Sequence, residues 1–114
     1  MIENMPRTWL GEFELMVLLA VIRLAEDAYG VLISREIEQC SGREVALGSV
    51  YAALERLEEK GLVRSRLGEP TAERGGRAKR FFCVTAQGLR EAREAQRTLT
   101  ALWSRNPQLE GGAG

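Results

Sequence analysis

The sequence predicts a mainly α fold of the α+β class, with three helices, a two-stranded hairpin and one long helix in that order. Apolar residues recur every three or four positions up to residue 61, which is the period of a helix. They then alternate in two short segments around a charged loop, which indicates strands, and the helical period returns from residue 86. A hairpin directly after a pair of helices joined by a short turn forms a wing. The order therefore predicts a winged helix-turn-helix with a two-stranded β wing and a C-terminal helix.

The first predicted helix covers residues 10–24 and is apolar on more than one side. Its main stripe comprises Phe13, Met16, Val17, Ala20 and Leu24. The apolar surface extends beyond this stripe to Leu15, Leu18, Leu19 and Ile22. Such a helix must be buried almost all round. Because one small domain supplies little cover, we expect a second subunit to cover part of it.

Glycines mark the ends of the second and third helices. The second helix covers residues 31–42 and ends at Gly42, where a helix C-terminus often needs a residue of positive φ. Its apolar stripe is expected to comprise Ile33, Ile37 and Cys40. The third helix covers residues 47–61 and stops at Gly61. Its apolar stripe comprises Leu47, Val50, Leu54 and Leu57.

The wing is expected to have strands at residues 62–67 and 79–85. A lone hairpin is marginally stable in water, so this one must pack on the helices. Phe82 and Val84 are the side chains expected to make that contact, because aromatic and β-branched residues suit a pleated surface.

Thr85 is expected to cap a last helix that covers residues 86–103. Small and apolar residues follow one another along it at three- and four-residue spacing, which is a short coiled-coil-like signal. The chain is therefore divided into a winged-helix domain at 1–85, a dimerisation helix at 86–104 and a flexible tail at 105–114.

The charge of the chain is unevenly distributed although its net charge is zero. Residues 1–61 hold six basic and eleven acidic residues, a net of −5, whereas residues 62–82 hold six basic and two acidic residues, a net of +4. Four of these cations lie in the stretch RGGRAKR at 74–80. Such a loop suits the phosphates of a duplex, because its cations replace counterions released from DNA and its glycines permit close approach of the backbone.

Other features argue against several classes of function. The chain has no histidine, no cluster with metal-ligand spacing and no nucleophile-with-base signature, so we expect neither an enzyme nor a cofactor or metal site. Cys40 and Cys83 are expected to be reduced, partly buried thiols of a cytoplasmic protein. No signal peptide or membrane-spanning apolar run stands out, which also favours the cytoplasm.

Three segments resemble the PadR-like winged-helix transcriptional regulators. They are YGVLISREIE in the second helix, GSVYAALERLEEKGLV from the third helix into the first strand, and RGGRAKRFFCVTAQG from the wing into the last helix. The resemblance covers about residues 10–89, and three segments in order at the right spacing make it specific. It implies a sequence-specific DNA-binding regulator, more in keeping with a repressor than an activator, in the short form with one C-terminal helix.

The resemblance also implies which residues contact DNA and which form a homodimer. The third helix, at about 48–60, would enter the major groove, and the wing, at about 68–79, would contact phosphates or the minor groove. The residues expected at DNA are Ser49, Tyr51, Ala52, Arg56, Arg74, Arg77 and Lys79. Those expected at the dimer interface are Leu15, Leu19, Leu89, Ala92, Leu99, Leu102 and Trp103.

Other interpretations stay open. Tyr51 would also fit the border of the core, and Arg56 would also fit an ion pair with a glutamate one turn away. The whole chain would also fit a winged-helix protein-interaction module without DNA binding, because a fold does not fix a function. A third possibility is a regulator that responds to a small apolar ligand at the dimer centre, beside the aromatic Trp103.

Overall fold

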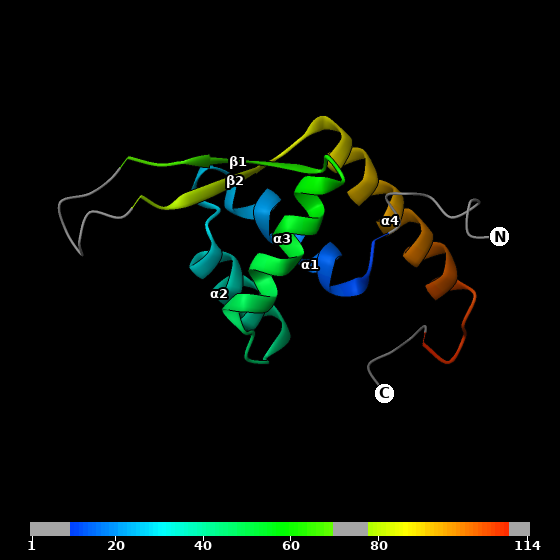
Figure 1. Ribbon diagram of the computed structural model, residues 1–114. Coiled ribbons are helices and arrows are strands. Elements are labelled where there is room, and N and C mark those ends of the chain that lie inside the picture. The colour runs from blue at the N-terminus through cyan, green and yellow to red at the C-terminus, as the bar shows by residue number, and fades with distance from the viewer. Residues whose placement is uncertain (1–9, 70–77, 110–114) are drawn as a thin grey trace.

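The computed structural model describes residues 10–69 and 78–109. Its elements follow the predicted order: α1 (Glu12–Leu24), the short 3₁₀ turn η2 (Ala25–Asp27), α2 (Gly30–Ser41), α3 (Leu47–Glu59), β1 (Val63–Leu67), β2 (Arg80–Val84) and α4 (Ala86–Ser104). The first three helices pack together, the hairpin extends from them on one side, and α4 leads away on the other (Figure 1). No helix within the described ranges is long and apolar enough to cross a membrane.

Local sequence signals set the helix ends. Gly42 follows α2 with a φ of +73°, and Gly61 follows α3 with a φ of +77°, a left-handed conformation that glycine adopts without a steric cost. The Thr85 hydroxyl caps α4 by accepting a hydrogen bond of 3.0 Å from the Gly88 N–H. All three predictions are confirmed. The start of α1 lies at Glu12 rather than at residue 10, because Gly11 is the extended N-cap residue.

The hairpin is antiparallel, with Val63 opposite Val84 and Leu67 opposite Arg80. One face carries the buried Val63 and Phe82 against the helices, and Val84 packs partly on the same core. The predicted contact of Phe82 and Val84 with the helices is therefore confirmed. The Phe82 N–H also donates a hydrogen bond of 2.8 Å to the Ala28 carbonyl, which joins the hairpin to the segment before α2.

The core lies where α1, α2 and α3 meet and extends under the hairpin. Its largest fully buried side chains are Leu18, Ile33, Leu54, Leu57, Leu62, Val17, Val21, Val50 and Val63. The described part of the chain does not cover the apolar surface of α1 all round, because the Leu19 side chain is 47% exposed. This agrees with the expectation that one small domain leaves part of α1 to be covered by another subunit. The prediction that Cys40 belongs to the buried stripe of α2 was wrong. Cys40, in the last turn of α2, lies beyond the buried stripe of Ile33 and Ile37 and is exposed.

The two cysteines are exposed, free thiols, so the prediction of partial burial was wrong for both. Cys83 lies on the outer face of the hairpin opposite Arg64, since its neighbours Phe82 and Val84 point inward and side chains alternate along a strand. The predicted tail begins with turns up to residue 109, and its remaining residues, 110–114, lie outside the described part of the chain.

Candidate nucleic-acid interface

The exposed side of α3 carries a short stripe of predicted contact residues. Ser49, Ala52 and Arg56 are three and four positions apart, which places them on one side of the helix. All three are exposed, whereas the facing core residues Val50 and Leu57 are fully buried. The helix therefore turns this stripe to the surface, as an element that enters a groove of DNA requires. Glu55 and Glu59 are also exposed on α3, so not all of its surface attracts phosphate.

Tyr51 borders this stripe and rests on the start of α2. Its side chain is 42% exposed. A Cβ atom at Gly30, the first residue of α2, would lie 2.4 Å from the Tyr51 hydroxyl oxygen, so the glycine makes room for the phenol. The hydroxyl end of Tyr51 thus packs against the start of α2, in line with the alternative that places this residue at the border of the core, and the side chain remains partly accessible from outside.

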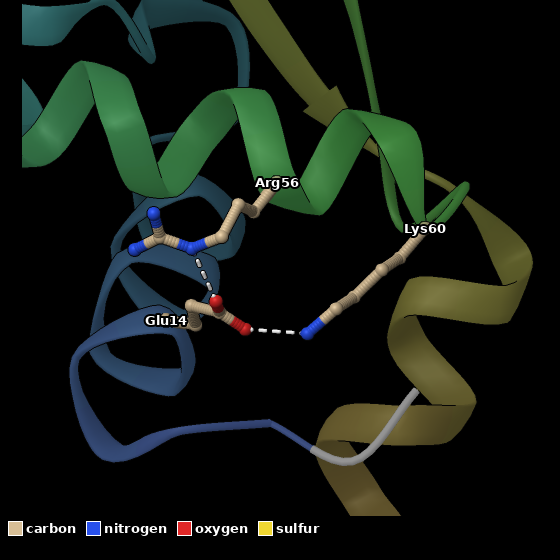
Figure 2. A network of polar contacts seen from close by, with 3 residues as sticks. All are labelled: Glu14, Arg56 and Lys60. Atoms are coloured by element: carbon tan, nitrogen blue, oxygen red, sulfur yellow. Dashed lines mark hydrogen bonds and ion pairs between the residues drawn. The ribbon is translucent and has the colours of Figure 1, made fainter. Parts of the chain in front are cut away.

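Arg56 is held by a carboxylate from another helix. Its Nε donates a hydrogen bond of 2.6 Å to one oxygen of Glu14 on α1, and the Lys60 Nζ donates one of 2.6 Å to the other oxygen (Figure 2). The Glu14 residue is 9% exposed, and the Arg56 side chain is 51% exposed. The expected alternative, a pair with a glutamate one turn away, was wrong about the partner, since Glu14 precedes Arg56 by 42 residues.

The environment of Glu14 stabilises its charged form. Burial raises the pKa of its carboxyl, but the hydrogen bonds and positive charges of Lys60 and Arg56 outweigh burial, and the pKa lies below its ordinary value of 4.5. The carboxylate is therefore charged at neutral pH, and it ties the start of α1 to the last turn and the C-cap of α3.

Replacing Glu14 with glutamine is expected to lower the free energy of unfolding by about 1–2 kcal/mol at pH 7, because charge-assisted hydrogen bonds are lost. A carboxyl whose pKa is lowered by folding stabilises the fold above its unfolded-state pKa, and this contribution is lost as the pH falls through the folded-state pKa. The difference from wild type is therefore expected to shrink in acid. Urea denaturation of both proteins from pH 7 down to about pH 2.5 measures it. A difference that stays constant with pH would contradict a role of the carboxylate charge.

A row of cations and aromatic rings fixes the base of the wing. The Arg66 guanidinium lies 4.9 Å from the centre of the Phe81 ring, and the Lys79 Nζ lies 4.4 Å from the centre of the Tyr29 ring. The two rings contact each other edge to face, with centres 5.4 Å apart. Cation–π and edge-to-face contacts of this kind are attractive. The wing therefore holds Arg66 and Lys79 against its outer face, close to the segment that precedes α2.

The structure describes one of the three predicted wing contacts. Lys79 lies at the base of the wing over Tyr29, whereas Arg74 and Arg77 lie outside the described residues. Prediction from the sequence missed Arg66, although its alternation with Arg64 along β1 placed both on one strand face. It also missed Tyr29, which directly precedes the second helix, and Glu14, for which the sequence gives no signal.

The residues predicted for a dimer interface divide into two groups. Leu99, Leu102 and Trp103 on α4 are exposed, as is Leu19 on α1. Ala92 is buried in the core of its own chain, and Leu15 and Leu89 are partly buried. Beside Leu19, a mostly apolar groove of about 400 Å³ runs between α1 and α2, with Met16, Ala20 and Ile37 among its lining residues.

The protein family of this chain follows from its match to a family model. The model of the PadR-like family of transcriptional regulators matches residues 18–94, from the middle of α1 to the middle of α4. The chain belongs to this family. Members of the PadR-like family are transcriptional regulators, so the expectation that the chain is not an enzyme is confirmed through the family.

Solved structures of PadR-like proteins share the fold. A PadR-like transcriptional regulator from Bacillus cereus superposes with a TM-score of 0.68 at 22% identity, over 88% of this chain and 92% of that one. A PadR-like transcription factor from Bacteroides fragilis superposes with a TM-score of 0.66 at 19% identity, over 79% and 82% of the two chains. The predicted winged-helix fold class is therefore confirmed.

One curated relative is closer in sequence but much longer. Over 60 residues the PadR-like chain is 45% identical to an uncharacterized 37.1 kDa protein in transposon TN4556 of Streptomyces fradiae. The match covers 53% of this chain and 15% of the relative. The chain thus spans a small part of that protein's length, and the similarity concerns this module alone.

Proposed function

We propose that this PadR-like protein is a cytoplasmic, sequence-specific DNA-binding regulator that acts as a homodimer and represses by occupying a promoter. Residues 48–60 enter the major groove, and the wing at about 68–79 contacts phosphates or the minor groove. The observation that carries the proposal is the exposed stripe of Ser49, Ala52 and Arg56 on α3, in a family of transcriptional regulators. Tyr51 contributes a hydroxyl donor at its border.

The homodimer is proposed from the apolar residues that one chain leaves exposed. Leu19 on α1 and Leu99, Leu102 and Trp103 on α4 lie on the two terminal helices. Apolar side chains that the described part of the chain leaves exposed favour association with a second copy. In this arrangement residues 1–85 form the DNA-binding domain and 86–104 the dimerisation helix. Two copies of α3 would then contact two half-sites about one turn of DNA apart.

The direct test is binding of fluorescent duplexes by anisotropy over a salt series. One duplex carries the DNA upstream of the protein's own gene, and the other carries the same bases in scrambled order. If four to eight phosphate contacts form, the slope of log K against log salt is expected to be roughly −4 to −7. Tight binding to the first duplex and weaker binding to the second would support the regulator. Lack of affinity for either duplex at low salt would favour the protein-interaction module.

Replacing Arg74, Arg77 and Lys79 together with alanine is expected to weaken binding to both duplexes alike and to flatten the salt slope by up to three. Phosphate contacts carry no base information, so the ratio of the two affinities should remain. The same salt series measures the change. A control triple with equal loss of charge replaces Arg23 on α1, Arg35 on α2 and Arg43 just after α2. An equal effect of both triples would remove the wing from the interface.

A ligand-responsive form of this function is favoured by the groove between α1 and α2. Its lining is mostly apolar and it adjoins Leu19, on the surface proposed for dimerisation. A small apolar ligand bound there would contact the helices that set the distance between the two recognition helices. Thermal stabilisation by such a ligand together with a matching loss of DNA affinity would support it.

A further inference from the structure

We infer that Glu14 is a positioning residue for DNA recognition, which holds the Arg56 guanidinium through Nε and directs its terminal nitrogens outward to the DNA. The inference rests on the proposed function and adds a residue of α1 to the recognition surface of α3. Glu14 itself is too deeply buried to touch a duplex, so it acts only through Arg56.

The contact leaves the recognising end of the arginine available. Glu14 binds the Nε atom, and the two terminal nitrogens of Arg56 point away from both Glu14 and Lys60 (Figure 2). These two nitrogens are the ones that can bind a phosphate or the O6 and N7 atoms of guanine together. Because the guanidinium is planar and rigid, a hydrogen bond at Nε also fixes the plane in which they lie.

The position of Arg56 suits such a role. It lies four residues after Ala52 and seven after Ser49, on the same exposed side of α3. A long side chain normally loses much rotamer freedom on binding, and a side chain fixed beforehand loses less. Glu14 supplies that fixation from a helix packed behind α3, so the side chain is oriented before DNA arrives.

Lys60 completes the arrangement by occupying the second oxygen of Glu14 at 2.6 Å. Two positive groups around one carboxylate leave the cluster with a charge of +1. The cluster therefore attracts a phosphate near Arg56. A Glu14–Arg56 pair without Lys60 would have no net charge and would attract the phosphate less. Lys60 is less exposed than Arg56, with 23% of its side chain accessible, which places Arg56 as the outer member of the cluster.

Two explanations of the cluster predict opposite effects of Glu14→Gln. If the only effect of Glu14 is that its negative charge offsets the positive charges of Arg56 and Lys60, removing that charge raises the affinity for every duplex. If it positions Arg56, the same change weakens binding to the recognised sequence while binding to unrelated DNA stays the same or rises. The ratio of the two affinities thus separates positioning from simple electrostatics, and also from a merely structural role.

The experiment compares wild type, Glu14→Gln and Glu12→Gln on two probes: a duplex that wild type selects from a randomised 30-base-pair pool, and the unselected pool. Glu12→Gln is the matched control, because it removes the same charge from the same turn of α1 at an exposed residue. We expect Glu14→Gln to weaken binding to the selected duplex about tenfold without weakening binding to the pool. Glu12→Gln should change both affinities by one factor.

A double-mutant cycle with Arg56→Gln shows whether Glu14 acts through Arg56. In the Arg56→Gln background, Glu14→Gln should have little further effect on the selected duplex. A full tenfold effect there, or equal factors on both probes for Glu14→Gln, would overturn the inference.

Where Glu14→Gln does not fold, Glu14→Asp keeps the charge, withdraws the carboxylate by one methylene and should also lower selectivity. Failure of wild type to select any duplex would remove the proposed function and this inference with it, whereas selection unaffected by Glu14 removes the inference alone.

Discussion

Replacing Gly88 with alanine is expected to lower the free energy of unfolding by about 3 kcal/mol or more. Gly88 is buried in the first turn of α4, and a Cβ atom there would lie 2.2 Å from the Leu62 carbonyl oxygen and 2.8 Å from a methyl group of Val84. The carbonyl cannot simply move away, because it accepts a hydrogen bond of 3.0 Å from the Thr85 N–H. The added methyl group therefore forces α4 away from Leu62 and Val84, which lie at the end of the hairpin remote from the wing loop.

Gly48 provides the matched control for this prediction. It also lies in the first turn of a helix, α3, but a Cβ atom there would meet nothing within 4 Å. Gly48→Ala is expected to raise the free energy of unfolding by about 0.5 kcal/mol, because alanine loses less backbone entropy in a helix. Urea denaturation followed by circular dichroism measures both variants. Shifts of the same sign would contradict the close approach of α4 to Leu62.

The features that were predictable from the sequence are those that depend on neighbouring residues. Gly42 and Gly61 end helices through their own φ, and Thr85 caps α4 through an N–H three residues away. The alternation that placed Phe82 inward needs only the two-residue period of a strand. Each of these signals acts over fewer than about five residues, so the chain order reveals it.

The features that were not predictable depend on residues far apart in the chain. Glu14 meets Arg56 and Lys60 across 42 and 46 residues, and its spacing on α1 gives no indication of either partner. Lys79 was assigned to the DNA surface from the basic loop and the family resemblance, and its contact with Tyr29 follows from the packing of the hairpin beside η2. The proposed set of contact residues on α3 came from helical spacing and family resemblance, but how each side chain is held follows only from the assembled fold.

Replacing Leu99 with glutamate is expected to convert the proposed dimer to a monomer and to weaken binding to a two-half-site duplex by about 100-fold. The Leu99 side chain is 52% exposed on α4, so a charge there costs the isolated chain little. In a dimer the same charge would be buried without a partner, which is strongly unfavourable. The monomer then binds each half-site separately and loses the high effective concentration that links two sites. Sedimentation and anisotropy measure the two effects.

Ala101→Glu separates the effect of position from the effect of charge. Ala101 lies two residues from Leu99, so about 200° of helical rotation brings it to nearly the opposite side of α4, and it is exposed. This variant adds the same charge to the same turn but should remain dimeric and bind DNA as wild type does. If Leu99→Glu also sediments as a dimer, α4 is not the essential contact, and the exposed Leu19 on α1 becomes the site to change next. If both variants are monomeric, charge on α4 rather than a specific apolar seam controls association. Only a difference between the two faces assigns the interface to the Leu99 side, because both variants place the same glutamate side chain in the same turn of α4.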